Sequence, residues 1–162
     1  MTQKILIEPL TEAAFAPFGD VLHANGTPDK MINQGLCGRF HDRARVDFGQ
    51  DGRAGISIFQ AQPRSLPYTL DMMERHPDGS QAFISMSEHP FLIAVAPDDN
   101  GKPGRPHAFL SDGKQAINIH RNVWHGVLTP LAEPGLFAVV DRIGKTINLE
   151  EYWFQTQYVL TS

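Results

Sequence analysis

Apolar residues recur along the chain in short blocks that are separated by turn residues. In blocks such as 55–61 and 115–119, apolar and polar residues alternate, which predicts strands with one buried face. The block 91–96 is almost continuously apolar and is typical of a strand that is buried on both faces. The chain contains 14 glycines and 12 prolines, which punctuate it at the spacing of an all-β sandwich or barrel. We therefore expect strands at 5–7, 20–22, 55–61, 68–76, 81–86, 91–96, 107–110, 115–119, 135–142 and 152–160.

Two short helices are also predicted, one near each end of the chain. Residues 10–16 form the first, because Thr11 can cap its first turn and Pro17 ends it. The second begins at Asn148, a capping residue that is followed by two glutamates in the first turn. Few helices, many short strands and dense turns predict one mainly β domain, 1–162, built as an antiparallel β-barrel or jelly roll. Such folds leave an internal cavity at one mouth.

Residues 31–55 interrupt this pattern, since they are weakly apolar and carry four arginines. The simpler interpretation is a solvated loop or edge strands. The alternative is that one arginine reaches the functional site, because its planar guanidinium matches a carboxylate.

The composition excludes several classes of partner. The net charge is −4 and no basic cluster is present, so we expect neither nucleic acid nor a membrane surface as a partner. No apolar run approaches the roughly 20 residues that span a bilayer, and the N-terminus lacks the apolar core of a signal peptide. Cys37 is the only cysteine, so no disulfide can form within the chain, and we expect a small buried side chain there. We therefore expect a cytoplasmic protein.

One constellation of polar residues could carry chemistry. Glu74 and His76 are two residues apart, so on a strand they point to the same face. A Pro-Asp-Gly-Ser turn then leads into Gln81, which could face the same space across a hairpin, and the distant His125 could close that space. Imidazole and carboxylate groups suit Zn, Ni, Mn or Fe, whereas the same groups could transfer protons without a metal. An ordinary surface pair is the simpler interpretation of Glu74 and His76.

Several further residues are candidates for substrate binding. The side chains of Lys114, Arg121 and Arg142 could each capture an anion, and Gln81 offers an amide group. Asp141 and Arg142 end a strongly apolar strand, where they would otherwise form a structural ion pair. Lys114 and Arg121 would otherwise be solvated surface charges.

Blocks that span nearly the whole chain carry a family resemblance. They are the opening at 9–20, Glu-Arg-His-Pro-Asp-Gly-Ser-Gln-Ala-Phe-Ile at 74–84, Ala-Val-Ala-Pro at 94–97, Trp124-His125, and Val-Val-Asp-Arg-Ile-Gly at 139–144. In this order, the blocks resemble the ureidoglycolate lyase family of allantoin catabolism. The resemblance implies a cupin-like β-barrel (a double-stranded β-helix), a homodimer, and cleavage of (S)-ureidoglycolate to glyoxylate and urea. It also implies that Glu74, His76 and His125 are catalytic.

The resemblance also implies a metal. Cupins bind their metal through an H-x-H-x3-4-E pattern and a distant histidine, and in this chain Glu74, His76, Gln81 and His125 match that pattern with two ligands replaced. These four residues would hold a divalent metal, nickel or manganese. Because two ligands are replaced, we expect a reaction that is weakly metal-assisted or metal-free, with His76 or His125 as the base. The alternatives are another metal-dependent cupin enzyme and a non-catalytic cupin that binds a metabolite.

Overall fold

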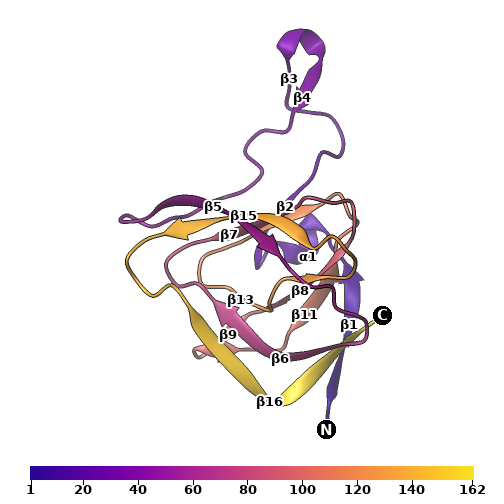
Figure 1. Ribbon diagram of the computed structural model, residues 1–162, viewed down its shortest axis with the longest axis vertical. Helices are drawn as coiled ribbons and strands as arrows, with labels where there is room; N and C mark the ends of the chain where they lie inside the picture. Colours follow the sequence, from indigo (N-terminus) through magenta and orange to yellow (C-terminus); the bar gives the residue numbers. More distant parts are fainter.

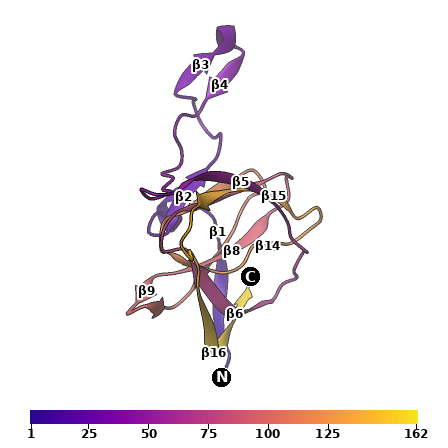
Figure 2. The same ribbon diagram turned by 60° about the vertical axis from the view of Figure 1, so that its left-hand side comes forward.

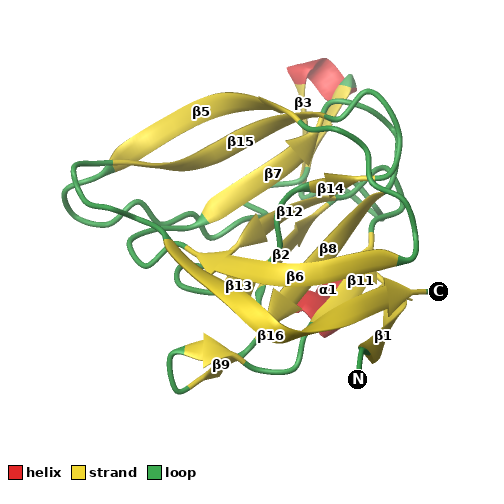
Figure 3. Cartoon of the chain, turned by 60° about the horizontal axis from the view of Figure 1, so that its bottom comes forward, coloured by secondary structure: helices red, strands yellow, loops and turns green.

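Most of the chain forms two β-sheets that pack face to face (Figure 1, Figure 3). A computed structural model of the protein describes all 162 residues. The first sheet has the strand order β11-β1-β16-β6-β13-β8-β14, and a further pairing of β11 with β8 closes a six-stranded barrel. Its strands are β1 (Gln3–Pro9), β6 (Tyr68–Arg75), β8 (Phe91–Ala96), β11 (His107–Leu110), β13 (Trp124–His125), β14 (Thr129–Pro130) and β16 (Glu150–Thr161).

The second sheet is antiparallel throughout and has the order β2-β12-β7-β15-β5. Its strands are β2 (Gly19–Leu22), β5 (Arg53–Gln60), β7 (Gln81–Ser85), β12 (Ala116–Ile119) and β15 (Leu136–Ile143). Two small hairpins pair β3 (Lys30–Ile32) with β4 (Cys37–Arg39), and β9 (Asp98–Asp99) with β10 (Lys102–Pro103). The helices are α1 (Glu12–Phe15) and a single 3₁₀ turn, Asn33–Gly35.

Strand β8 separates two hydrophobic cores. All six of its residues are buried, which confirms the prediction from its continuous apolar run. Phe91, Ile93 and Val95 pack in the core between the two sheets, because alternate side chains of a strand point to opposite faces. Leu92, Ala94 and Ala96 pack on the other face, in a core built only from strands of the closed barrel.

The predicted mainly β barrel with few helices is confirmed, with three local corrections. The helix after Thr11 forms, and the Thr11 hydroxyl accepts a hydrogen bond from the Ala14 N–H. The helix predicted at Asn148 is wrong, because the following residues form β16, which pairs with β6 and β1. Strand β1 runs parallel to β11 and β16, so the barrel is not antiparallel throughout. Cys37 is exposed rather than buried, since it lies in the β3–β4 hairpin.

The chain between β2 and β5 leaves the body as an arm that ends in the β3–β4 hairpin (Figure 2). Met31 and Leu36 near its tip are 52% and 86% exposed. The returning segment is fixed to the second sheet, because the Arg45 N–H donates to Asp20 and the Asp47 N–H donates to Ser80. This arm is the segment that the sequence marked as a loop or edge strands.

No helix of the structure combines the length and the apolar character that crossing a bilayer would require.

Candidate active site

The site lies where the ends of β6 and β13 face the beginning of β7. Glu74 of β6 is paired in register with His125 of β13, so the two side chains share a face. His76 follows β6 directly, and Gln81 is the first residue of β7. The predicted hairpin does not form, because β6 and β7 belong to different sheets. The turn between them instead crosses from one sheet to the other and places Gln81 opposite His76.

The structure brings together the four residues that the sequence singled out, and we call them the Glu74 cluster: Glu74, His76, Gln81 and His125. Glu74, His76 and His125 each offer one ligand atom, and these atoms all lie within 4.8 Å of one another. The centroids of the two imidazole rings are 5.1 Å apart. Gln81 completes the group, since its Oε1 lies 3.0 Å from Nε2 of His76.

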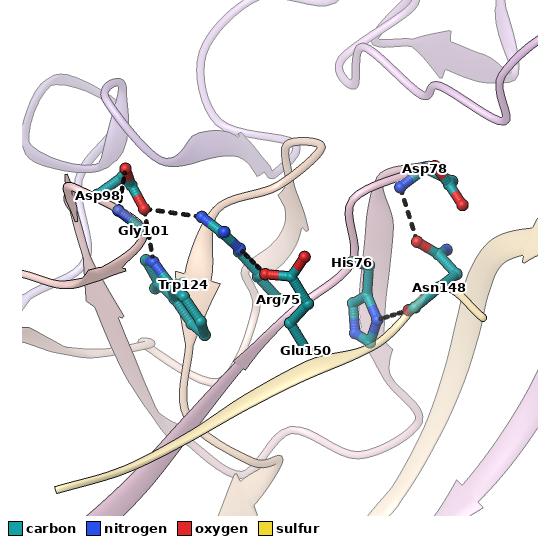
Figure 4. A network of polar contacts seen from close by, with 8 residues as sticks. All are labelled: Arg75, His76, Asp78, Asp98, Gly101, Trp124, Asn148 and Glu150. Atoms are coloured by element: carbon teal, nitrogen blue, oxygen red, sulfur yellow. Dashed lines mark hydrogen bonds and ion pairs between the residues drawn. The ribbon is translucent and has the colours of Figure 1, made fainter.

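Both ring nitrogens of His76 face oxygen atoms. Nδ1 lies 2.8 Å from the backbone oxygen of Asn148 (Figure 4), and Nε2 faces Gln81. The Gln81 amide nitrogen donates to Asp141 at 3.1 Å, so its oxygen is the end that faces the ring. A neutral imidazole carries only one N–H, and the pairing is therefore complete only with a second proton or with a cation between the ring and Gln81.

His125 presents the opposite arrangement. Its Nδ1 donates to the backbone oxygen of Gly126 at 2.9 Å, and its buried Nε2 has no hydrogen-bond partner. Burial and, to a smaller extent, the neighbouring charge of His76 together lower the pKa of His125 to about 4. The ring is accordingly neutral, with a free lone pair on Nε2.

The Glu74 carboxylate has no hydrogen-bond partner in the structure. Burial raises its pKa above the ordinary value. The charge of His76 lowers this pKa and the charge of Glu151, its neighbour on β16, raises it, but burial dominates. Its negative charge therefore has no hydrogen-bond donor, and the charge of His76 does not outweigh the effect of burial.

These donor atoms fit a divalent metal. Two imidazoles, one carboxylate and one amide oxygen suit the first-row transition metals. In metal sites, the second nitrogen of a ligating histidine commonly donates to a backbone carbonyl, which fixes the tautomer. Here the Nδ1 atoms of His76 and His125 both lie against backbone oxygens, and the orphaned Nε2 of His125 is available for coordination.

The segment 146–150 is hydrogen-bonded to the end of β6 and to the residues that follow it (Figure 4). Asn148 contacts those residues twice, since its backbone oxygen faces His76 and its side-chain oxygen accepts from the Asp78 N–H at 2.7 Å. Glu150 accepts a hydrogen bond from Arg75, whose guanidinium also bonds Asp98. Asn148 therefore does not cap the helix that the sequence predicted, but bonds the segment that follows β6.

The cationic candidates lie outside the cluster. Arg121 and Arg142 line a neighbouring polar pocket of about 600 Å³, together with Asp78. The predicted ion pair of Asp141 with Arg142 does not form, because consecutive side chains of β15 point to opposite faces. Arg142 instead donates to the backbone oxygen of Phe48 at 2.6 Å, and its buried Nε has no partner. Lys114 precedes β12, at the end of that strand opposite to the one that pairs with Gln81.

Comparisons with known proteins identify the family. A family model described as ureidoglycolate lyase matches residues 2–161. The chain belongs to the ureidoglycolate lyase family. The ureidoglycolate lyase of Rhodobacter capsulatus is 58% identical over 150 residues, which cover 93% of each chain. That of Chelativorans sp. is 50% identical over 157 residues, covering 96% of this chain and 95% of the relative. That of Rhizobium etli is 48% identical over 161 residues, covering 99% and 97%.

The sequence pattern misses two residues of this candidate site. The sequence suggests only an ion pair of Asp141 with Arg142, whereas the Asp141 side chain accepts a hydrogen bond from Gln81 across the β7–β15 pair. Asn148 was assigned to a helix cap, although it bonds the His76–Asp78 segment. The pairing of β15 with β7 would have suggested the first contact, whereas no local signal points to the second.

Proposed function

We propose that this protein cleaves (S)-ureidoglycolate to glyoxylate and urea. The observation that carries the proposal is the Glu74 cluster, with its unpartnered His125 nitrogen, in a chain that matches the ureidoglycolate lyase family over residues 2–161. Ureidoglycolate carries a hydroxyl, a carboxylate and a ureido nitrogen on one carbon. Its cleavage needs proton transfer, a group for the carboxylate and polar partners for the ureido end.

The two histidines suit the two proton transfers. In this proposal, the free Nε2 of His125 takes the proton of the substrate hydroxyl, whose oxygen becomes the carbonyl oxygen of glyoxylate. The C–N bond breaks, and His76 delivers a proton to the nitrogen that leaves as urea. One proton is removed and one is returned, so the reaction needs no water and no nucleophile from the protein.

We further propose that the Glu74 cluster can hold a divalent metal, nickel or manganese. Glu74, His76, Gln81 and His125 are the residues that would bind it. A metal in this position would supply Lewis acidity, which stabilises charge on a substrate oxygen. The test is elemental analysis of the purified protein and an activity assay after chelation. If chelated protein keeps full activity, the metal is dispensable and the histidines act alone; if activity falls and Ni or Mn restores it, the metal takes part.

Binding of the substrate is assigned to the amide and guanidinium groups. We assign the ureido end to Gln81, and its position beside His76 supports this assignment. Arg121 and Arg142 are the candidate partners of the carboxylate, and the unpartnered Nε of Arg142 supports the second of them. We leave Lys114 out of the proposed site because of its position at the far end of β12.

The products of the reaction test this function directly. Purified protein incubated with (S)-ureidoglycolate should release urea and glyoxylate in equal amounts, without ammonia. Ammonia release, or no turnover despite binding, would contradict the proposal and favour another reaction or a metabolite-binding role.

We also propose that the protein is a homodimer that associates through the outer face of the second sheet. Ile56, Ile58 and Ile84 on this face are 75%, 59% and 38% exposed, and Val140 and Ala138 lie between them in register. An apolar patch of this kind is typical of an interaction surface. In a two-fold dimer the same surface occurs on both copies, so an apolar patch is complementary to itself. The arm projects from the same side of the molecule, which supports a contact between the arm and a second copy (Figure 2).

Light scattering tests the dimer. We expect a dimer at micromolar concentration and a monomer for the double variant Ile56→Lys/Ile58→Lys. The matched control is Leu6→Lys, because Leu6 is 69% exposed on the barrel instead of the second sheet. A monomeric original protein would refute the proposal.

We propose a cytoplasmic location as well, which is supported by the single cysteine, and cell fractionation tests it.

A further inference from the structure

Asp141 is a carboxylate beside the Glu74 cluster to which the proposed reaction gives no role. It lies on β15 directly opposite Gln81 of β7. Its Oδ2 accepts a hydrogen bond from Nε2 of Gln81 at 3.1 Å, and this is the only hydrogen bond of the Asp141 side chain. Asp141 is therefore hydrogen-bonded to the cluster through Gln81 alone.

This hydrogen bond determines which end of the Gln81 amide faces His76. An ionised carboxylate only accepts hydrogen bonds, so it attracts the NH₂ end of the amide and repels the oxygen. The Gln81 oxygen is then left 3.0 Å from Nε2 of His76. If the amide rotated by half a turn, two oxygens would face each other at Asp141 and an NH₂ group would face the ring.

The orientation of Gln81 in turn determines what the His76 ring can do. With oxygens of Gln81 and Asn148 against its two nitrogens, the ring is held in one plane and Nε2 is kept as a donor or beside a cation. With an NH₂ group against Nε2, the ring could only accept there.

We propose that Asp141 is a positioning residue, which orients Gln81 and through it fixes the donor state and the orientation of His76. The effect of Asp141 on the rate of urea release rests on the proposed function, whereas its effect on the imidazole ring of His76 does not. Asp141 itself does not touch the substrate.

A purely structural role for Asp141 would be to hold β15 against β7. The strands do not need its side chain for this, because they are paired in register over residues 137–141 and 81–85. The two roles therefore differ in their consequences for the ring of His76, and the experiment measures that ring.

The kinetic arm compares Asp141→Ala, Asp141→Asn, Gln81→Ala and the double variant Asp141→Ala/Gln81→Ala. We expect Asp141→Ala to lower kcat/KM for urea release about tenfold or more, because the orientation of Gln81 and of His76 is lost. Asp141→Asn keeps an acceptor oxygen for Gln81 and should retain most of the activity. The double variant should be no slower than Gln81→Ala, since residues that act through one another are not additive.

The spectroscopic arm uses ¹⁵N-NMR of the histidine rings and needs no activity. Asp141→Ala should change the Nε2 signal of His76, and Asp141→Asn should preserve it. The ring of His23, which bonds Glu12 on the surface, is the internal control. Asp112→Ala is the control variant, because it removes an exposed carboxylate next to Lys114.

The outcomes separate the alternatives. Unchanged His76 signals in Asp141→Ala would overturn the proposal, even if activity fell, because a merely structural residue would act in that way. Additive losses in the double variant would overturn it as well. If the original protein released no urea, the proposed function would fail, and the ring signals would still decide the role of Asp141.

Discussion

Two clusters in this molecule contain the same three kinds of side chain, a carboxylate, a histidine and an amide. In the Asp20 cluster, formed by Asp20, Asn118 and His120, Oδ2 of Asp20 accepts hydrogen bonds from both side chains at 3.0 and 2.9 Å and from the Arg45 N–H at 2.8 Å. In the Glu74 cluster, the carboxylate accepts no hydrogen bond and Nε2 of His125 has no partner.

This difference in hydrogen bonding shifts the pKa values of the two carboxylates in opposite directions. Burial raises the pKa of Asp20, but the hydrogen bonds from Asn118, Arg45 and His120 outweigh it and leave the pKa below the ordinary value. For Glu74, burial is the largest influence and leaves the pKa raised. The Asp20 carboxylate is thus paired with three donors and fixes the base of the arm, although the buried Oδ1 of Asn118 has no partner. In the Glu74 cluster, by contrast, the carboxylate and Nε2 of His125 are the unpaired atoms, and a substrate or a metal can use them.

Substituting His125 should have the largest effect. His125→Phe removes the free Nε2 but keeps a ring in an apolar surrounding, so we expect turnover to fall by on the order of a hundredfold or more while the protein still folds. Steady-state urea release and circular dichroism measure the two effects. His107→Phe is the control, because His107 is an exposed ring that packs on Phe18. Turnover of His125→Phe at the original rate would show that its free nitrogen is not used.

Substituting Asp20 should lower the stability of the protein and leave its turnover unchanged. Asp20→Ala leaves donors of Asn118 and Arg45 unpaired, which costs about 1–3 kcal/mol of stability for a buried group. Urea denaturation should detect this loss, and the turnover per folded molecule should stay close to the original. A large fall in turnover without a loss of stability would mean that the Asp20 cluster also serves the reaction.

Substituting Glu74 should increase stability while it lowers activity. Because its pKa is raised in the folded state, ionisation of Glu74 disfavours folding at pH values above the ordinary value of 4.5. Glu74→Gln removes this penalty in metal-free protein near pH 7, and a gain of about 1 kcal/mol would raise Tm by roughly 2–4 °C. Calorimetry would contradict the account if Glu74→Gln melted below the original protein.

The pH dependence of Asp20 should be the smallest effect, and its sign is opposite to that of Glu74. Because the pKa of Asp20 is lowered, its contribution to stability is present above the ordinary value of 3.8 and is lost as the pH falls below it. Denaturation midpoints measured from about pH 5 to pH 3 should therefore fall less steeply for Asp20→Asn than for the original protein. Equal slopes would indicate that Asp20 is not stabilised by its three donors.

The sequence predicted the elements well where a local pattern determines them. The continuous apolar run at 91–96 indicated burial on both faces, and the motif from Glu74 to Gln81 with the distant His125 indicated the cluster. In both cases the side-chain spacing on a strand carries the information.

The remaining features depend on pairings between distant segments. The capping signal at Asn148 was overruled, because the residues after it pair with β6 and β1 as part of the barrel. The bonds of Asp141 to Gln81 and of Asn148 to His76 join residues 60 and 72 positions apart, so no local pattern could place them. The separation of Lys114 from the cluster likewise follows from the sheet order.

The most direct test of the central claim compares His76→Ala with His120→Ala in one assay of urea release from (S)-ureidoglycolate. Each variant removes one histidine that faces an oxygen acceptor, and only the first belongs to the Glu74 cluster. We predict that His76→Ala lowers kcat by on the order of a hundredfold or more and remains folded, while His120→Ala keeps its turnover and loses stability. Full activity of His76→Ala, or an equal loss in both variants, would contradict the assignment of the reaction to the Glu74 cluster.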